Sequence, residues 1–292
     1  MIDLESVNKI FTQPGGDRVH ALCDVSLHVP EGQFVTTIGT NGSGKSTLLN
    51  AVAGRFFPDS GAIRIVGRDV THQPEHQRAR LIGRVFQNPF QGTCPSLTVA
   101  ENLHLAAGRG QPRRLQRGLS SQERQRYAEM LARFGMGLEE RLDATVGTLS
   151  GGQRQAVTLL MATIRRPQIL LLDEHTAALD PKAAEQIASI TKEIVREEGL
   201  TTLMVTHSMA QALALGDRTV MMHQGRIIDD LQGAERRRTR VQHLLDRFAQ
   251  LRREELLSDE MVTLISLPYT FWTPSYSNAW SLTGMGIPSF KK

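Results

Sequence analysis

Apolar and polar residues alternate along much of the first 66 residues, which is the pattern of β-strands with one buried face. Ile2 and Leu4 alternate with acidic residues, and residues 25–29 repeat the alternation. The run from Phe34 to Ile38 is typical of a strand buried on both faces. A glycine-rich turn follows it, and the pattern then predicts a helix from about Lys45 to Ala53.

The middle of the chain has a different character. Residues from about 98 to 164 are rich in Arg, Gln, Glu, Leu and Ala, which favour helices. Two apolar runs, 169–172 and 202–205, predict buried strands, and between them apolar residues recur at helical spacing: Ala183, Ile187, Ile190 and Ile194. A helix that connects two strands predicts an α/β fold with a parallel sheet. We expect antiparallel strands in its N-terminal part and a helical subdomain inserted at about residues 90–160.

The C-terminal region breaks with both patterns. Both tryptophans lie after residue 265, among prolines and glycines, in a segment without helical or strand periodicity. We therefore predict a main domain over residues 1–247 and an extension over 248–292 that is poorly ordered from about residue 259. Three interpretations of the extension stay open: a disordered end, a docking segment for a partner, and sequence of no selected function.

Composition narrows the class of protein. The 292 residues are 40% hydrophobic, and their apolar runs are far shorter than the ~20 residues of a membrane-spanning helix. The start, Met1 to Glu5, lacks the layout of a signal peptide, so we expect a cytoplasmic protein. Cys23 and Cys94 lack metal-site spacing. The net charge is +4, and no aromatic residues interleave with the basic clusters at 113–117 and 236–238, which favours solvated faces over nucleic-acid binding.

A glycine-rich segment joins the strand at Phe34–Ile38 to the predicted helix. It consists of Gly39, Thr40, Asn41, Gly42, Ser43, Gly44, Lys45 and Ser46. The spacing G-x-x-x-x-G-K-S between a strand and a helix is that of a loop whose N–H groups surround phosphate oxygens. Lys45 can reach the terminal phosphates and the Ser46 hydroxyl can ligate Mg²⁺. The alternative is a glycine-rich turn that binds nothing.

The apolar run 169–172 ends in two carboxylates, Asp173 and Glu174. Because ligands bind at the carboxyl ends of parallel strands, both acids are expected beside the phosphate loop. Asp173 suits the coordination shell of Mg²⁺, and Glu174 can orient or deprotonate an attacking water. Without the phosphate loop, a pair of surface acids would explain them equally well.

A second glycine-rich loop precedes the apolar segment 156–164. It consists of Leu149, Ser150, Gly151, Gly152 and Gln153, and its place before a helix makes it a second candidate anion site. Together with the two motifs above, in this order and spacing, it resembles the signature motif of ATP-binding cassette (ABC) ATPases. The resemblance covers residues from about 1 to 235. It implies a P-loop NTPase core with an ABC-type helical subdomain, and hydrolysis of ATP with Mg²⁺ as cofactor.

The resemblance then assigns further residues. The implied ATP contacts are Phe11, which would stack on adenine, and Gly39, Thr40, Asn41, Gly42, Ser43, Gly44, Lys45, Ser46 and Thr47. The implied metal ligands are Ser46, Gln87 and Asp173, and the implied catalytic residues are Glu174, His207 and Gln87. His207 would hold the γ-phosphate. The alternatives are a core aromatic for Phe11, a surface loop residue for Gln87 and a structural histidine for His207.

In ABC ATPases a second subunit completes the site. Ser150, Gly151, Gly152, Gln153 and Asp180 would contact the ATP held by the other chain of a homodimer or a dimer of similar subunits. Asp180, which precedes Pro181, also suits a helix N-cap. The resemblance further implies an integral membrane permease that contacts the surface around residues 87–103. The subunit would then lie on the cytoplasmic face of the membrane.

The stretch LLLDEHTAALDP, residues 170–181, resembles one bacterial subgroup whose importers use an extracytoplasmic binding protein. It implies import of a small solute, with amino acids among the candidates. Most family members carry Pro or Ala at the position of His175, which either tunes Glu174 or is an ordinary interface residue. Two other functions stay open. An ABC ATPase acting on ribosomes or DNA would usually have two cassettes or sustained heptads. A regulator that does not hydrolyse would not need Glu174 and His207.

Overall fold

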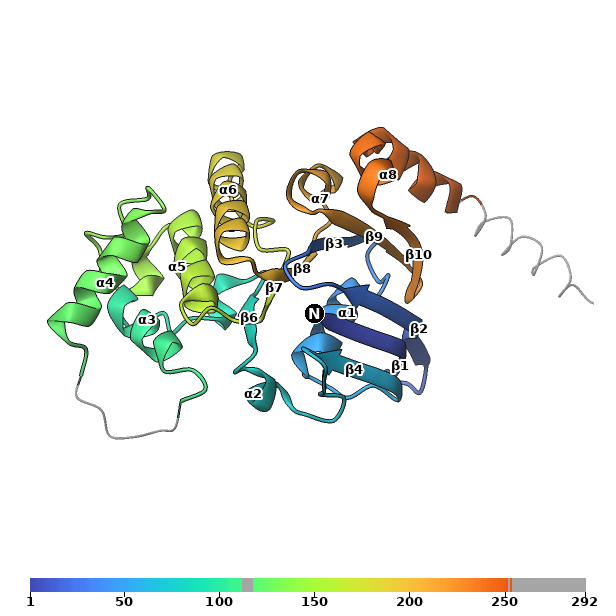
Figure 1. Cartoon of the computed structure of the whole chain (residues 1–292), viewed down its shortest axis with the longest axis horizontal. Coiled ribbons are helices and arrows are strands. Elements are labelled where there is room, and N and C mark those ends of the chain that lie inside the picture. The colour runs from blue at the N-terminus through green and yellow to red at the C-terminus, as the bar shows by residue number, and fades with distance from the viewer. Residues whose placement is uncertain (112–117, 252, 254–292) are drawn as a thin grey trace, which may run out of the picture. The chain divides into compact units, whose positions relative to one another are not determined.

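The computed structural model describes residues 1–111, 118–251 and 253, and it divides the chain into two compact units, Met1–Val241 and Gln242–Lys292 (Figure 1). The described residues of the second unit, 242–251 and 253, are helical. The predictions for the tail from residue 259 and for the basic cluster at 113–117 lie outside the described residues. The boundary at residue 247 stays a prediction.

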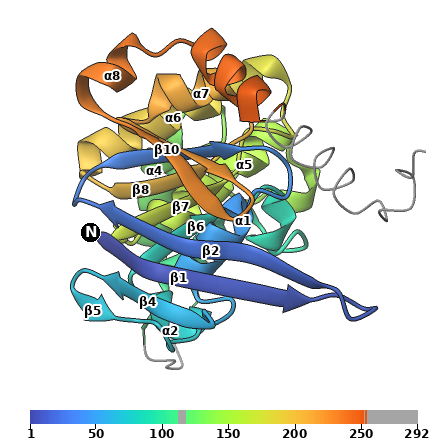
Figure 2. The ribbon, with the colours of Figure 1, turned by 90° about the vertical axis from the view of Figure 1, so that its right-hand side faces the viewer.

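The first unit contains an antiparallel sheet built mainly from the N-terminal strands. Its order is β2 (Arg18–Val29), β1 (Ile2–Thr12), β4 (Ser60–Ile65) and β5 (Arg68–Asp69). The first strand pairs antiparallel with both β2 and β4, and Figure 2 shows β1 and β2 as a long ribbon pair. The alternation of apolar and polar residues places Ile2, Leu4 and Val25 in the core. The prediction of antiparallel strands in this part is confirmed.

A second sheet carries the parallel strands. Its order is β10 (Arg226–Leu231), β9 (Arg218–His223), β3 (Phe34–Gly39), β8 (Thr201–Val205), β7 (Ile169–Asp173) and β6 (Ile82–Val85). All neighbours in it are parallel except β10, which runs antiparallel to β9. The α/β fold with a parallel sheet is therefore confirmed. The carboxyl ends of β3, β6, β7 and β8 meet at one edge, which is where the candidate residues cluster.

Helices lie between many of the strands along the chain. They are α1 (Lys45–Ala53), α2 (Glu75–Arg78), α3 (Val99–Ala107), α4 (Ser121–Ala132), α5 (Gly151–Thr163), α6 (Pro181–Glu198), α7 (Met209–Leu215) and α8 (Gly233–Arg238), with short 3₁₀ turns at Pro89–Gln91 and Val146–Thr148. The first helix contacts strands of both sheets, β2 of one and β3, β7 and β8 of the other (Figure 2). Its residues Leu48, Leu49 and Val52 are fully buried, so α1 is part of the core, whereas Ser46 at its start is exposed.

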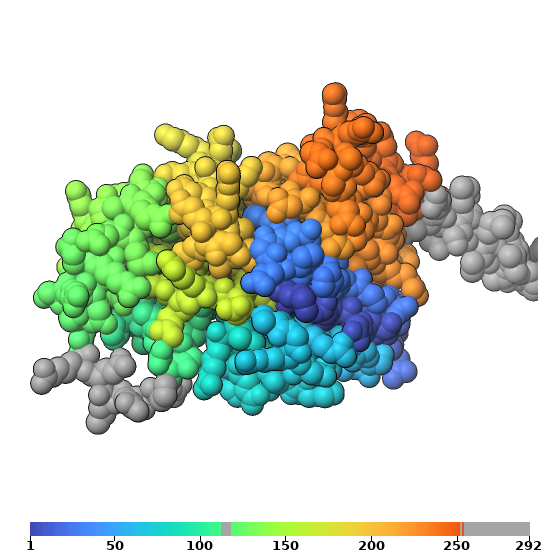
Figure 3. All heavy atoms as spheres, in the orientation of Figure 1, coloured from blue at the N-terminus to red at the C-terminus, as the bar shows by residue number. Residues whose placement is uncertain are grey.

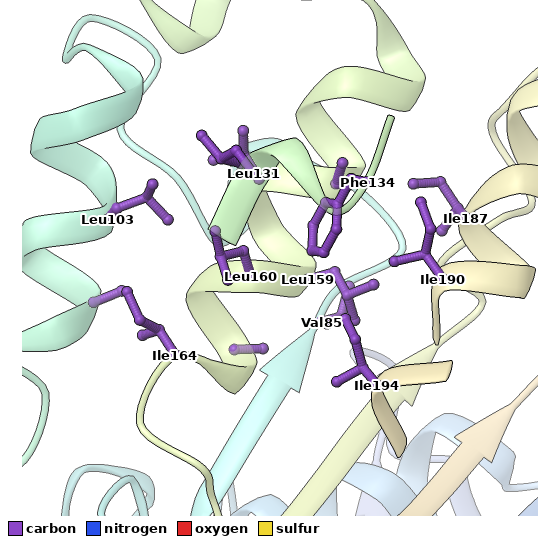
Figure 4. Close-up of a cluster of buried hydrophobic side chains, with 14 of the residues drawn as sticks. Val85, Leu103, Leu131, Phe134, Leu159, Leu160, Ile164, Ile187, Ile190 and Ile194 are labelled. Atoms are coloured by element: carbon purple, nitrogen blue, oxygen red, sulfur yellow. The ribbon is translucent and has the colours of Figure 1, made fainter. Parts of the chain in front are cut away.

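The segment between β6 and β7 folds mainly as helices. Side chains of α3, α4, α5 and α6 converge on one hydrophobic cluster that includes Leu103, Leu131, Leu159 and Ile187 (Figure 4). The helical segment, green in Figure 3, lies on one side of the first unit, and the blue N-terminal strands lie on the other. Three of these helices begin with a side-chain capping box: α3 and α4 with the sequence Ser/Thr-x-x-Glu, and α5 with Ser-x-x-Gln.

The expectation of a solvated basic face at residues 236–238 is wrong for Arg236. The cluster at 236–238 suggested a solvated basic face, but Arg236 is only 9% exposed. Its guanidinium donates to the backbone carbonyls of Ala212 and Gly216 at 3.0 and 2.7 Å. A cation is stabilised by the carbonyl end of a helix, and α7 ends there. Within the described residues, no helix is both long and apolar enough to cross a membrane.

Candidate functional site

The loop between β3 and α1 has a backbone that only glycine adopts easily. Gly42 and Gly44 have φ angles of 77° and 97°. A Cβ atom on Gly44 would lie 2.5 Å from the carbonyl oxygen of Ala21, which is a clash with backbone. Gly44 is the N-cap of α1 and no side chain caps it, so the first N–H groups of the helix have no side-chain cap. Uncapped N–H groups suit a phosphate.

Lys45 places a positive charge beside this loop. Its side-chain Nζ donates to the carbonyl oxygens of Gly39 and Thr40 at 2.9 and 2.8 Å. Burial lowers the pKa of Lys45, while the nearby carboxylates Glu174 and Asp173 raise it. Asn41, Gly42 and Ser46 are exposed and Thr47 is half-buried, so the loop is open to a ligand.

The structure brings Asp173 to the same place from the end of β7. Burial raises the pKa of its carboxyl, whereas Arg84 and a hydrogen bond from Ser46 lower it. The Ser46 hydroxyl and the Asp173 carboxylate are therefore neighbours, as the sequence predicted. Hydroxyl and carboxylate oxygens are the donors that Mg²⁺ prefers, and it binds through few protein groups plus phosphate and water. The described residues contain no cluster of three or more His, Cys, Asp or Glu suited to a metal.

Glu174 is the residue on which the catalytic candidates converge. Its Oε2 accepts a hydrogen bond from Nε2 of Gln87 at 3.2 Å and lies 3.3 Å from Nδ1 of His207. Its backbone is left-handed, with φ 42°, and its N–H donates to the carbonyl of Val205 at 2.9 Å. A strained backbone held by a neighbouring strand fixes the direction of the side chain.

These candidates come from three different strand ends. Gln87 follows β6, Glu174 follows β7 and His207 follows β8, so parallel pairing alone places them at one edge. The side chain of His207 is 58% exposed, which does not fit a structural histidine held in a core. Gln87 is also exposed, but its bond to Glu174 distinguishes it from an ordinary loop residue.

Phe11 lies near the end of β1. Its ring packs edge-on against Phe56, with 5.2 Å between ring centroids, and the ammonium of Lys9 lies 5.5 Å from its centroid. The residue is 38% exposed, so it is not a core aromatic. An exposed aromatic face fixed by two neighbours is suited to stacking on a base, although its role remains a prediction.

The second glycine-rich loop is built differently. Ser150 caps α5: its Oγ accepts from the N–H of Gln153 at 3.2 Å, and Oε1 of Gln153 accepts from the N–H of Ser150 at 3.3 Å. Ser150 and Gly151 are exposed. Across residues 1–111 and 118–251, no hydrogen bond or ion pair joins this loop to Lys45, Asp173 or Glu174. The structure of one chain thus does not bring the two loops together.

Asp180 and His175 flank the same region. Oδ1 of Asp180 accepts from the N–H of Ala183 at 3.0 Å, so Asp180 is the predicted N-cap of α6. His175 is 2% exposed, which does not fit a residue at an interface between chains. Its Nε2 lies 3.1 Å from the hydroxyl of Thr191, whose own proton goes to the carbonyl of Ile187. The ring is therefore the donor, and burial lowers its pKa to about 4.

Sequence reasoning did not single out Arg84, which lies at the same edge. One nitrogen of its guanidinium is 3.7 Å from Oδ2 of Asp173 and 2.6 Å from Oδ1 of Asn50. The available signal was a charged residue inside a short buried strand, since Ile82 and Val85 on either side of it are core residues.

A family model and two relatives named as ATP-binding proteins of transport or import all match this chain. A family model described as ABC transporter matches residues 22–177. The chain is 40% identical over 248 residues to a tyrosine transport ATP-binding protein of Clostridioides difficile. The matched region covers 85% of this chain and 98% of that protein. It is 38% identical over 233 residues to the methionine import ATP-binding protein MetN of Pasteurella multocida, covering 78% of this chain and 64% of that longer protein.

Solved structures agree. The fold is similar to that of a dimeric bacterial ABC transporter cassette, with a TM-score of 0.68 and 30% identity over 80% of this chain and 98% of that one. It is equally similar, with a TM-score of 0.68 and 31% identity, to a dimeric post-hydrolysis state bound to ADP and phosphate, again over 80% of this chain and 98% of that one. With the phosphate loop and the carboxylates that face it, these matches show that the chain belongs to the ABC transporter family and is an ATPase of that family.

Proposed function

We propose that the edge formed by β3, β6, β7 and β8 hydrolyses ATP with Glu174 as the residue that orients the attacking water. The observation that carries this proposal is the convergence of Gln87 and His207 on one oxygen of Glu174, next to the phosphate loop. Phosphoryl transfer depends mainly on positioning and on stabilising charge, and both require such a fixed cluster.

Each residue has a separate task in this proposal. The N–H groups of Gly39–Ser46 and the ammonium of Lys45 bind the phosphates. Ser46, Asp173 and Gln87 would hold Mg²⁺, which supplies neutralisation of phosphate charge when it is bound. Glu174 accepts a hydrogen bond or the proton from water, and His207 donates to the γ-phosphate. Phe11 stacks on the adenine ring.

Replacing Glu174 tests the proposal. Glu174→Gln keeps the shape of the side chain but removes the base, so ATP binding should persist while hydrolysis slows by ~10²-fold or more. A matched control is Glu193→Gln, the same chemical change on an exposed position of α6. Near-normal turnover by Glu174→Gln, with the control also normal, would remove Glu174 from the assigned role.

We further propose that two chains complete each other's sites. Ser150 and Gly151 are exposed and lack a bonded partner in the phosphate site of their own chain, and a similar cassette is dimeric. Ser150–Gln153 and Asp180 of one chain would then contact the ATP held by Gly39–Thr47 of the other. We assign this ATPase domain to residues 1–247 and propose that the extension at 248–292 is not needed for hydrolysis.

We propose that the subunit drives import through a separate permease. The relatives named for tyrosine and methionine favour an amino acid as the solute, and a solute-binding protein outside the membrane would deliver it. The chain would then be peripheral, on the cytoplasmic face. Uptake assays on amino acids, with and without this subunit, test the proposal. Loss of efflux rather than uptake on deletion would contradict import.

A groove of about 440 Å³ beside β6 and α3 is our candidate for permease docking. It is lined mainly by apolar side chains, including Phe86, Leu105 and Met161, and Leu105 is 60% exposed. Glu75, Arg84 and Arg109 add charges. A groove of this kind fits an amphipathic helix with a polar edge. Its lining residue Phe86 directly precedes Gln87 in the chain, so an occupant of the groove would contact the segment that carries Gln87.

Cys94 gives a direct test of the groove, because it lines it and is exposed, whereas Cys23 is buried. A maleimide should label Cys94 in the isolated subunit and label it much more slowly in the permease complex. A Cys94→Ser variant reports any labelling of Cys23. Equal labelling rates in the two states would exclude this groove as the docking site.

A further inference from the structure

Arg84 is a charged residue in a strand that is otherwise apolar. It occupies β6 opposite Leu171 of β7 and is followed on the other face by Val85. Its side chain is only 8% exposed. Because side chains alternate along a strand, Arg84 shares its face of the sheet with Asp173, two residues after Leu171.

Several segments hold the guanidinium in place. One Nη donates to Asn50 of α1 at 2.6 Å, and the other lies 3.5 Å from Oε1 of Glu75 in α2. The ring centroid of Phe86 lies 4.6 Å from its central carbon. The remaining Nε is buried and makes no hydrogen bond within the described chain. With contacts on several sides, this cation has a fixed position.

Arg84 acts on Asp173 by charge rather than by a hydrogen bond. The shortest distance between them is 3.7 Å, which is beyond hydrogen-bonding range. Asp173 keeps its position through other contacts: its strand pairs with β6 and β8, opposite Val205, and the side chain of Ser46 lies beside its carboxylate. Removing the guanidinium would therefore change the field at the carboxylate without removing a bond that holds it.

We propose that Arg84 is a positioning residue that acts through Asp173, as a fixed positive charge that weakens the affinity of the nucleotide site for Mg²⁺. This inference rests on the proposed function, which assigns Mg²⁺ to Ser46, Gln87 and Asp173. Two like charges near one carboxylate compete, and at a half-buried site their repulsion is much larger than in water. The guanidinium cannot relieve it by losing its proton. Weaker retention of the metal favours release of the nucleotide after hydrolysis.

Glu75 supplies an opposite-sign test. It lies near the other terminal nitrogen of the guanidinium from Asp173 and its side chain is 48% exposed, so it offsets part of the positive charge. Removing Arg84's charge should strengthen metal binding, while removing the charge of Glu75 should weaken it. A purely structural role for Arg84 predicts no such pair of opposite effects.

The measurement is the ATP dissociation constant in EDTA divided by that in saturating Mg²⁺, in full-length chains that also carry Glu174→Gln. This ratio reports the coupling between metal and nucleotide. Binding of Mn²⁺ in the presence of ADP, followed by paramagnetic resonance, provides a second readout. Arg84→Met should raise the ratio by about fivefold or more, Arg84→Lys should leave it within about twofold, and Glu75→Gln should lower it.

The outcomes separate this inference from the proposed function. A parent chain with a ratio near one would contradict the Mg²⁺ assignment itself. A parent ratio above one that Arg84→Met leaves unchanged or lowers would overturn the inference alone. So would equal effects of Met and Lys, since then side-chain shape and not charge would matter. If Arg84→Met does not fold, Glu75→Gln decides: a lower ratio supports the inference and an unchanged ratio overturns it.

Discussion

Two glycine-rich loops in this chain each precede a helix, but their backbones are satisfied in different ways. At Gly39–Ser46 the helix begins at Lys45, and its N-cap residue Gly44 has φ 97° and provides no side-chain cap. At Ser150–Gln153 the cap is a reciprocal pair of hydrogen bonds between Ser150 and Gln153. The first loop leaves N–H groups without a side-chain cap, and the second uses its own side chains to satisfy them.

The two loops also differ in the side chains that surround them. Lys45 belongs to the first loop, and Asp173 and Glu174 lie close enough to raise its pKa, so the candidate phosphate and metal residues lie together in one chain. In the second loop Gln153 is further held by Arg141 at 3.0 Å and donates to the carbonyl of Met136 at 3.1 Å. In the proposed function the first loop binds the phosphates of ATP within its own chain, whereas the second loop presents an exposed surface to a ligand held by the other chain.

The first prediction removes the charge of the first loop. Lys45→Ala should weaken ATP binding by roughly 10- to 100-fold or more, because a charged hydrogen-bond donor to the phosphates is lost. Fluorescent-nucleotide titration measures this. Lys182→Ala, at an exposed position of α6, is the matched control and should bind normally. Normal binding by Lys45→Ala would mean that the loop does not hold the nucleotide.

The same contrast explains what the sequence could predict. The positions of the first loop, Asp173 and Glu174 could be predicted from the local sequence, because the end of a strand and the start of a helix fix them. The meeting of Gln87 and His207 at Glu174 depends on the order of β6, β7 and β8 in the sheet, which periodicity alone does not reveal and only the family resemblance supplied.

Other features depend on tertiary packing that no local pattern encodes. The antiparallel edge strand β10 was not predicted, because its residues Arg226–Leu231 do not alternate cleanly and most are only half-buried. Arg236 and His175 carry polar groups whose burial is possible only because distant carbonyls or a hydroxyl receive them. A prediction from the charge of the side chain alone would place such residues at the surface.

The second prediction concerns whether the two loops act in different chains. In dimers with Ser150→Arg on one chain and Lys45→Ala on the other, one composite site keeps both functional loops and the other has neither. Such dimers, isolated with two affinity tags, should hydrolyse ATP at about half the wild-type rate. Each variant alone should be almost inactive, because both of its sites are defective.

The control uses the same two substitutions in a different arrangement. A chain carrying both Ser150→Arg and Lys45→Ala, paired with a wild-type chain, leaves each composite site with one defective loop. This dimer should be almost inactive. If it instead hydrolyses at half the wild-type rate while the first dimer does not, then each chain works with its own second loop and the composite site is excluded.

The third prediction separates the packing of the second loop from its exposed surface. A Cβ atom on Gly152 would lie 2.9 Å from Cβ of Ala183 in α6, whereas one on Gly151 would meet only Cδ2 of Leu179 at 3.4 Å. Gly152→Ala should therefore destabilise the fold by roughly 1–3 kcal/mol, because a packed helix cannot move aside easily. Gly151→Ala should change stability by less than about 0.5 kcal/mol, since alanine suits a helix.

Urea denaturation of the two variants measures this difference, and ATPase assays add a second contrast. Gly151 is exposed at the surface that would face the other chain's ATP, so Gly151→Ala should lose activity while keeping its stability. Gly152→Ala should mainly reduce stability. It should reduce activity only to the extent that the start of α5 is displaced. If Gly151→Ala proves the less stable variant, the packing argument is wrong. If Gly151→Ala is both stable and fully active, the exposed glycine has no role at a composite site.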